Sequence, residues 1–169
     1  MADETIGEQL GNLGDSARRA KESFVSIGQE LKDIKNDIQN SNEFFKDLTK
    51  TIGQGAAASQ KLAEAVERAK NGTASTKILN RQAADSLAKQ KELQAKIGEL
   101  LQKAANETNP KNAALLQLAA KRTADAADNA GQLAAGFQEA ARANAELDKN
   151  AQFFSRLGKL SSQIPGLGK

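Results

Sequence analysis

This chain of 169 residues contains no Cys, His, Trp or Tyr. Those absences exclude a disulfide scaffold and any Ser-His or Cys-His nucleophile pair, and make a zinc, haem or copper site unexpected. The net charge of +3 is small, and the composition, rich in Ala, Gln, Lys and Glu, favours long helices.

The first predicted element is a heptad helix over residues 1–70. From Ile6 to Ile52 apolar residues recur at steps of four and three, and Ser41 is the only polar residue in the series. A period of 3.5 residues predicts packing along the whole length against another helix. We call the strongest of these positions, with those of the last helix, the seam. Here it comprises Leu10, Leu13, Phe24, Ile27, Leu31, Ile34, Ile38, Phe45, Leu48 and Ile52.

Two breaks divide the rest of the chain. Asn71-Gly72 begins a predicted break or turn over residues 71–76, because Asn-Gly is typical of helix ends and turns. A middle helix over residues 77–106 follows. An Asn-Pro break over residues 107–110 ends it, because proline disfavours helical geometry in the residue before it and is welcome in a new first turn.

The C-terminal heptad helix is predicted over residues 111–160. Asn144 allows two interpretations: a polar residue that specifies register, or one tolerated in a weak stripe. Residues 161–169 contain Pro165 and two Gly and are predicted to be a non-helical tail, and we expect the chain to be part of a longer one. Here the seam comprises Leu116, Leu133, Phe137, Asn144, Leu147 and Phe154.

The predicted fold class is therefore all-α, with long heptad helices in an elongated coiled coil or helical bundle. We expect the seam to join copies of the chain, with a trimer favoured and a hexamer possible, because Phe24 and Phe45 are bulky for a two-stranded core. The carboxylates fall at outward positions, where solvated acids make poor proton donors or acceptors. We expect no enzyme activity, no catalytic residue, no cofactor and no metal.

Nucleic acid and membrane are not expected as partners of this segment. The basic residues of the middle helix are spread around it without aromatics to stack on bases. No apolar run approaches the roughly 18 residues of a membrane span.

The Ala- and Gln-rich heptads, the scattered Gly and two segments, "IGEQLGNLGDSARRAKESFVSIGQELKDI" and "SRLGKLSSQIPGLGK", resemble phage tail tape measure proteins. The resemblance implies a multi-copy helical bundle that fills the tail tube and sets its length. It also implies tail tube or tail tip proteins as partners, and a place in the virion after synthesis in the host cytoplasm. Tape measure proteins are much longer and carry apolar stretches that this chain lacks.

Two alternatives stay open. One is an antiparallel helical-bundle signalling or interaction module, cytoplasmic if not viral, that folds back at Asn71-Gly72 and Asn109-Pro110. The other is a largely disordered stress-protective protein similar to late-embryogenesis proteins, which the unbroken heptads from Ile6 to Ile52 disfavour.

Overall fold

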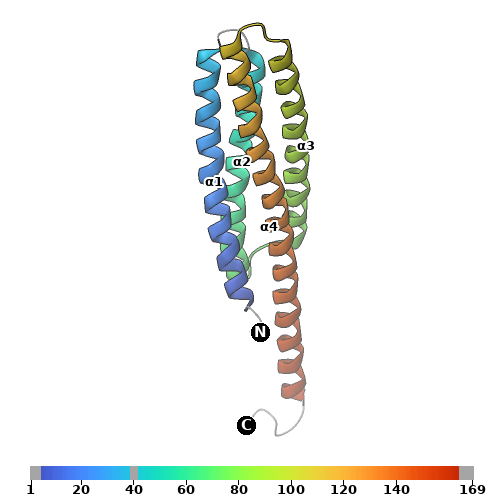
Figure 1. Cartoon of the computed structure of the whole chain (residues 1–169). Helices are drawn as coiled ribbons and strands as arrows, with labels where there is room; N and C mark the ends of the chain where they lie inside the picture. The colour runs from blue at the N-terminus through green and yellow to red at the C-terminus, as the bar shows by residue number, and fades with distance from the viewer. Residues whose placement is uncertain (1–4, 39–41, 164–169) are drawn as a thin grey trace.

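The computed structural model describes residues 5–38 and 42–163, with side chains described for 5–38 and 43–151. The predicted all-α fold is confirmed as a helical bundle, in which each helix runs antiparallel to the one before it (Figure 1). The helices are α1 (Ile6–Asp37), α2 (Asn42–Lys70), α3 (Thr76–Asn106) and α4 (Pro110–Gln163).

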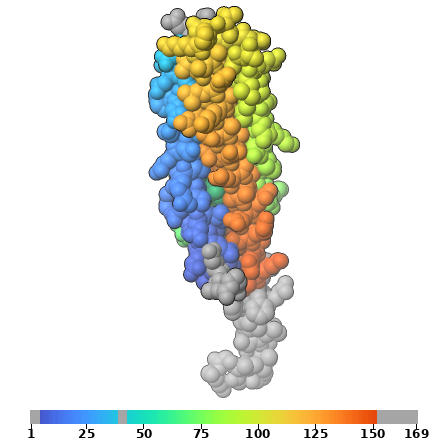
Figure 2. All heavy atoms as spheres, in the orientation of Figure 1, coloured from blue at the N-terminus to red at the C-terminus, as the bar shows by residue number. Residues whose placement is uncertain are grey.

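The helix α4 occupies the central place among the four. It packs on α1, α2 and α3, whereas α1 and α3 make no contact with each other in the described part of the chain. The most extensive packing is between α3 and α4 and then between α1 and α2, while α2 and α3 touch least. On the face shown in Figure 2, α4 lies between α1 and α3.

The prediction of a single helix over residues 1–70 is wrong. α1 ends at Asp37 and α2 begins at Asn42. Ile38 closes α1 with extended backbone geometry, and its N–H donates to Ile34 O at 2.9 Å. The segment around this break is rich in Asn, Asp and Ser, whose side chains compete for backbone hydrogen bonds and favour turns. The four-three spacing continues through the break, so it hides the reversal of the chain.

The chain reverses again between Lys70 and Thr76. Thr73 N donates to Arg68 O at 2.8 Å and Gly72 N to Ala69 O at 3.2 Å, the pattern of a Schellman helix end. Gly72 has a φ of +73°, in the left-handed region that favours glycine. Ser75 then caps α3, since its Oγ accepts from Ile78 N at 3.3 Å.

The third reversal uses Asn109 and Pro110. Asn109 Oδ1 accepts from Lys111 N at 2.9 Å, which caps the start of α4. Pro110 is the first residue of that helix, where its missing N–H costs nothing.

The predicted non-helical tail over residues 161–169 is wrong at its start, because α4 continues to Gln163. Gly158 lies within this helix, where a single glycine lowers helix propensity without ending the helix. Residues 164–169 lie outside the described part of the chain.

Two helical glycines receive large apolar side chains from a neighbouring helix. A Cβ added at Gly55 of α2 would lie 2.6 Å from Phe24 Cε1 of α1. A Cβ added at Gly136 of α4 would lie 2.8 Å from Leu62 Cδ2 of α2. These glycines are therefore the holes into which α1 and α2 insert their apolar side chains.

We predict opposite effects for two neighbouring Gly→Ala substitutions on α2. Gly55→Ala presses its Cβ against the buried Phe24 ring and destabilises by about 1–3 kcal/mol, as overpacking does. Gly53→Ala has nothing within 4 Å of the added Cβ. It stabilises by about 0.5–1 kcal/mol through helix propensity. Urea unfolding measures the free energy of unfolding of both variants relative to wild type. A change of the same sign in both variants contradicts the assigned packing.

Candidate functional site

The seam residues lie in the interior of one chain. Every seam residue from Leu10 to Ile52 is buried, and so are the seam residues of α4 from Leu116 to Asn144. Leu147 is partly buried against the core. The side chain of Phe154 lies outside the described residues. The buried members are Leu10, Leu13, Phe24, Ile27, Leu31, Ile34, Ile38, Phe45, Leu48, Ile52, Leu116, Leu133, Phe137 and Asn144.

The sequence analysis expects these residues to join separate copies, whereas in the structure they pack against one another within one chain. The three reversals turn the apolar stripe of each helix toward the other helices of the same chain. Heptad spacing requires a helical neighbour but does not state which chain supplies it. Here the chain supplies its own neighbours.

The sequence analysis missed how wide the buried stripe of α4 is. Besides the two heptad positions of the seam, a third position is buried in successive heptads, and each time it holds Ala. These residues are Ala120, Ala127, Ala134 and Ala141. A stripe this wide is typical of a bundle helix with several neighbours, and the recurring Ala was the signal available in the sequence.

Asn144 fixes the position of α4 against the turn between α2 and α3. It is 2% exposed. Its Nδ2 donates to Ala74 O at 3.2 Å and to Thr76 Oγ1 at 3.0 Å. Buried amides need such partners because an unmet hydrogen bond costs about 1–3 kcal/mol. The contact favours the first interpretation of Asn144, a residue that specifies register, but the register is that of helices within one chain.

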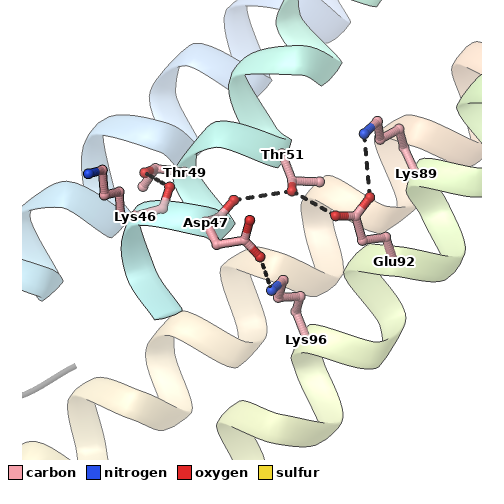
Figure 3. Close-up of polar contacts among 7 residues, drawn as sticks. All are labelled: Lys46, Asp47, Thr49, Thr51, Lys89, Glu92 and Lys96. Atoms are coloured by element: carbon pink, nitrogen blue, oxygen red, sulfur yellow. Dashed lines mark hydrogen bonds and ion pairs between the residues drawn. The ribbon is translucent and has the colours of Figure 1, made fainter. Parts of the chain in front are cut away.

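Polar contacts connect α2 and α3, the neighbouring pair that packs least (Figure 3). Asp47 of α2 forms an ion pair with Lys96 of α3. Thr51 Oγ1 donates to Asp47 O and lies 3.1 Å from Glu92 Oε1. Lys89 Nζ lies 3.4 Å from Glu92 Oε2. Each of these charged groups has a partner of opposite charge. The Asp47–Lys96 ion pair and the contact between Thr51 and Glu92 join the two helices.

Lys96 also lies against an aromatic ring. Its Nζ is 5.0 Å from the centroid of Phe44, and Lys103 Nζ is 5.2 Å from the same ring, both within the range of a cation–π contact. The hydrogen bond from Lys96 and its positive charge lower the pKa of Asp47 below the ordinary value of 3.8. The ionised Asp47 is therefore favoured by the folded state.

A second set of polar contacts lies between α1 and α4. Arg122 Nε is 2.5 Å from Glu30 Oε2 and Arg122 Nη1 is 3.3 Å from Asp125 Oδ2. Asn129 Nδ2 donates to Ser23 Oγ at 2.8 Å. Both bundle edges thus carry ion pairs outside an apolar centre, together with a hydroxyl contact between α2 and α3 and an amide contact between α1 and α4.

In the part of the chain that the structure describes, no group of three or more Asp and Glu gathers to hold a metal ion. None of the described helices has both the length and the apolar character needed to cross a membrane. No protein-family model matches the chain, and the searches of curated proteins and of solved structures gave no match.

We predict that Asp47→Asn lowers the melting temperature near pH 7, because it removes the anion that pairs with Lys96. The pKa of Asp47 is lower folded than unfolded, so its contribution is present above the unfolded pKa and is lost as pH falls through the folded pKa. The difference from wild type therefore shrinks as the pH falls below the ordinary value of 3.8.

Thermal melts across this pH range, followed by circular dichroism, provide the measurement. Asp128→Asn, at an exposed acid of α4, is the control and stays close to wild type throughout. A deficit in Asp47→Asn that persists unchanged at the lowest pH would contradict the ion-pair assignment.

Proposed function

We propose that this chain is a non-enzymatic structural module that assembles with other copies of itself. The unit is a four-helix bundle that closes its own core. The association uses the part of α4 that continues past the bundle, and the buried seam residues take no part in it.

The length of α4 carries this proposal. α4 has 54 residues, against 32, 29 and 31 in the other helices. Asn144 already contacts Thr76, the first residue of α3, so the 19 residues from Ala145 to Gln163 run past the start of α3. At 1.5 Å per residue this section is about 28 Å long. Figure 1 shows it continuing beyond the other helices.

The sequence pattern of this section supports association. Beyond Leu147, which is still partly buried against the core, Ala151 and Phe154 continue the four-three spacing that the bundle core uses. A heptad stripe needs another helix to cover it. A second copy presents the same stripe, and closed association of three or six copies remains the stoichiometry that we expect.

The resemblance to phage tail tape measure proteins provides a setting for such an assembly. Copies stacked along a tail tube need a narrow, elongated unit, and all four helices here run along one axis (Figure 1). In that setting the partners are tail tube or tail tip proteins, and the assembly lies in the tail lumen of a virion.

The antiparallel signalling or interaction module is the second candidate. Its support is the topology, because the chain folds back at Asn71-Gly72 and Asn109-Pro110 as that alternative requires. The disordered stress-protective alternative lacks this support, since the described residues form long helices around a buried core.

We predict that Phe154→Asp converts the assembled chain into a monomer, because a carboxylate in an apolar helix–helix contact carries a large desolvation cost. Gln152→Asp adds the same charge two residues away, off the heptad stripe, and serves as the control. Light scattering coupled to size-exclusion chromatography over a range of concentrations measures the mass. Wild type that stays monomeric, or equal masses for the two variants, overturns the proposal.

A further inference from the structure

A long groove follows the contact between α1 and α4, on the face shown in Figure 2. It consists of three hollows in series, of about 370, 280 and 480 Å³. The first two share Gln132, and the last two share Leu13, Ser16 and Glu139. The space is open because α1 packs less extensively on α4 than it does on α2. We call it the α1–α4 groove.

The α1–α4 groove matches in length the part of α4 that continues past the bundle, residues 145–163, which we call the extension. On α1 the lining begins at Gln9 and ends at Glu30, 21 residues further, which is about 32 Å along a helix. The 19 residues of the extension span about 28 Å. On α4 the lining reaches Glu146, so the groove ends where the extension begins.

The lining of the α1–α4 groove has an excess of negative charge. Its acids are Glu30, Asp125, Asp128, Glu139 and Glu146, and its bases are Arg122 and Arg142. Arg122 already pairs with both Glu30 and Asp125. Arg19, which donates to Ser16 at the edge of the groove, reduces the excess by one charge without removing it. The groove therefore favours a basic partner.

The extension carries the opposite charge. Its section over residues 149–163 contains no acid. It contains three bases, Lys149, Arg156 and Lys159. In the groove, Asp128, Glu139 and Glu146 are exposed, and none of them has an ion pair among the residues whose side chains are described. These acids are the ones that a basic helix can reach.

The extension also carries an apolar row on the side of α4 that faces the groove. Steps of four and three from Glu146 lead through Asn150 to Phe153, Leu157 and Leu160. Such steps keep residues on one side of a helix. Glu146 itself lines the groove. The polar row that α4 presents to the groove therefore continues as an apolar row in the extension.

We propose that the extension of each copy lies in the α1–α4 groove of a second copy, with the two α4 helices antiparallel. The inference rests on the proposed function, self-association through the extension, and names the surface that receives it. Each copy gives one extension and receives one, which closes the pair with two-fold symmetry. Such pairs build even numbers of copies, so an assembly of six consists of three pairs and a trimer does not form.

The lengths of the two surfaces set the register of this contact. The α4 lining of the groove, residues 122–146, has its middle at Ala134, and the extension has its middle at Phe154. Antiparallel helices that match these two midpoints share the level of Asn144. Residues at equal distances before and after Asn144 then face each other across the pair.

This register brings opposite charges together without adjustment. Lys149, five residues after Asn144, faces Glu139, five residues before it. Glu146 and Arg142, each two residues from Asn144, also face each other. By symmetry each contact occurs twice in the pair. Complementary charges of this kind fix the orientation and register of an interface more than they add affinity.

The same register places an apolar residue at the middle hollow. Phe153, nine residues after Asn144, faces Ala135, nine residues before it. Ala135 is exposed in this hollow, and Leu13 and Ala20 beside it each keep 8% of their surface exposed. A large residue thus meets small ones, as in the core of the bundle.

Charge reversal tests the register. We expect Lys149→Glu to weaken association about tenfold, because it opposes Glu139 in two contacts of each pair. Adding Glu139→Lys restores association. The two positions are ten residues apart on one helix, about 15 Å, so this rescue arises only between copies. Lys111→Glu, at an exposed base near the start of α4, is the matched control and leaves association unchanged. Sedimentation equilibrium measures the dissociation constants.

Disulfide trapping tests the reciprocal geometry. The chain has no Cys, and Glu139→Cys with Lys149→Cys cannot close within one helix, since a disulfide requires Cα atoms within about 7 Å. Oxidation is expected to yield a covalent pair of chains. The control, Glu139→Cys with Lys111→Cys, yields none. A ladder of larger products, as head-to-tail contacts produce, contradicts the symmetry of the pair.

The outcomes separate this inference from the proposed function. Wild type that stays monomeric overturns both. Wild type that assembles while Lys149→Glu and Lys111→Glu associate equally well, while the charge exchange fails to rescue, or while no disulfide forms between positions 139 and 149, overturns the groove as the receiving surface and leaves self-association standing.

Discussion

The structure depends on covering the large apolar side chains of α1 and α2 with the small ones of α4. Phe24, Leu31 and Phe45 are almost fully buried, and burial of such side chains is the main source of folding free energy. Many of the buried residues of α4 are Ala, and Gly136 receives a side chain of α2. These small residues allow the backbone of α4 to lie close to α1, α2 and α3 at the same time. The side chain of Leu62 at Gly136 shows how closely α4 approaches α2, and the ring of Phe24 at Gly55 shows the same for α1 and α2. A larger side chain at either glycine would push the helices apart.

Closure of the core within one chain decides which surfaces remain for function. The edges of the bundle carry ion pairs, such as Arg122 with Glu30, which fix helix positions and add little stability each. The part of α4 beyond Asn144 is different, because it continues past the start of α3. We propose that this part associates with a further helix.

The sequence was sufficient for some of these features. Periodicity and composition predicted an all-α fold and a set of heptad positions that are mostly buried, although we expected those positions to join separate copies. The Asn-Gly and Asn-Pro dipeptides are local signals for reversals. The break near Ile38 was missed because Ile38, Ser41 and Phe45 keep the heptad spacing across it. Heptads also look the same whether the neighbouring helix belongs to the same chain or to another copy.

The central claim is that the apolar stripes of α1 and α2 meet within one chain. Isotope-filtered nuclear Overhauser measurements on an equal, refolded mixture of carbon-13-labelled and unlabelled chains test it directly. The added-Cβ position of Gly55 lies 2.6 Å from Phe24 Cε1, so protons of these residues are close enough to give cross-peaks. The account predicts Phe24–Gly55 cross-peaks within labelled chains and none between labelled and unlabelled chains. Strong cross-peaks between the two kinds of chain would contradict it.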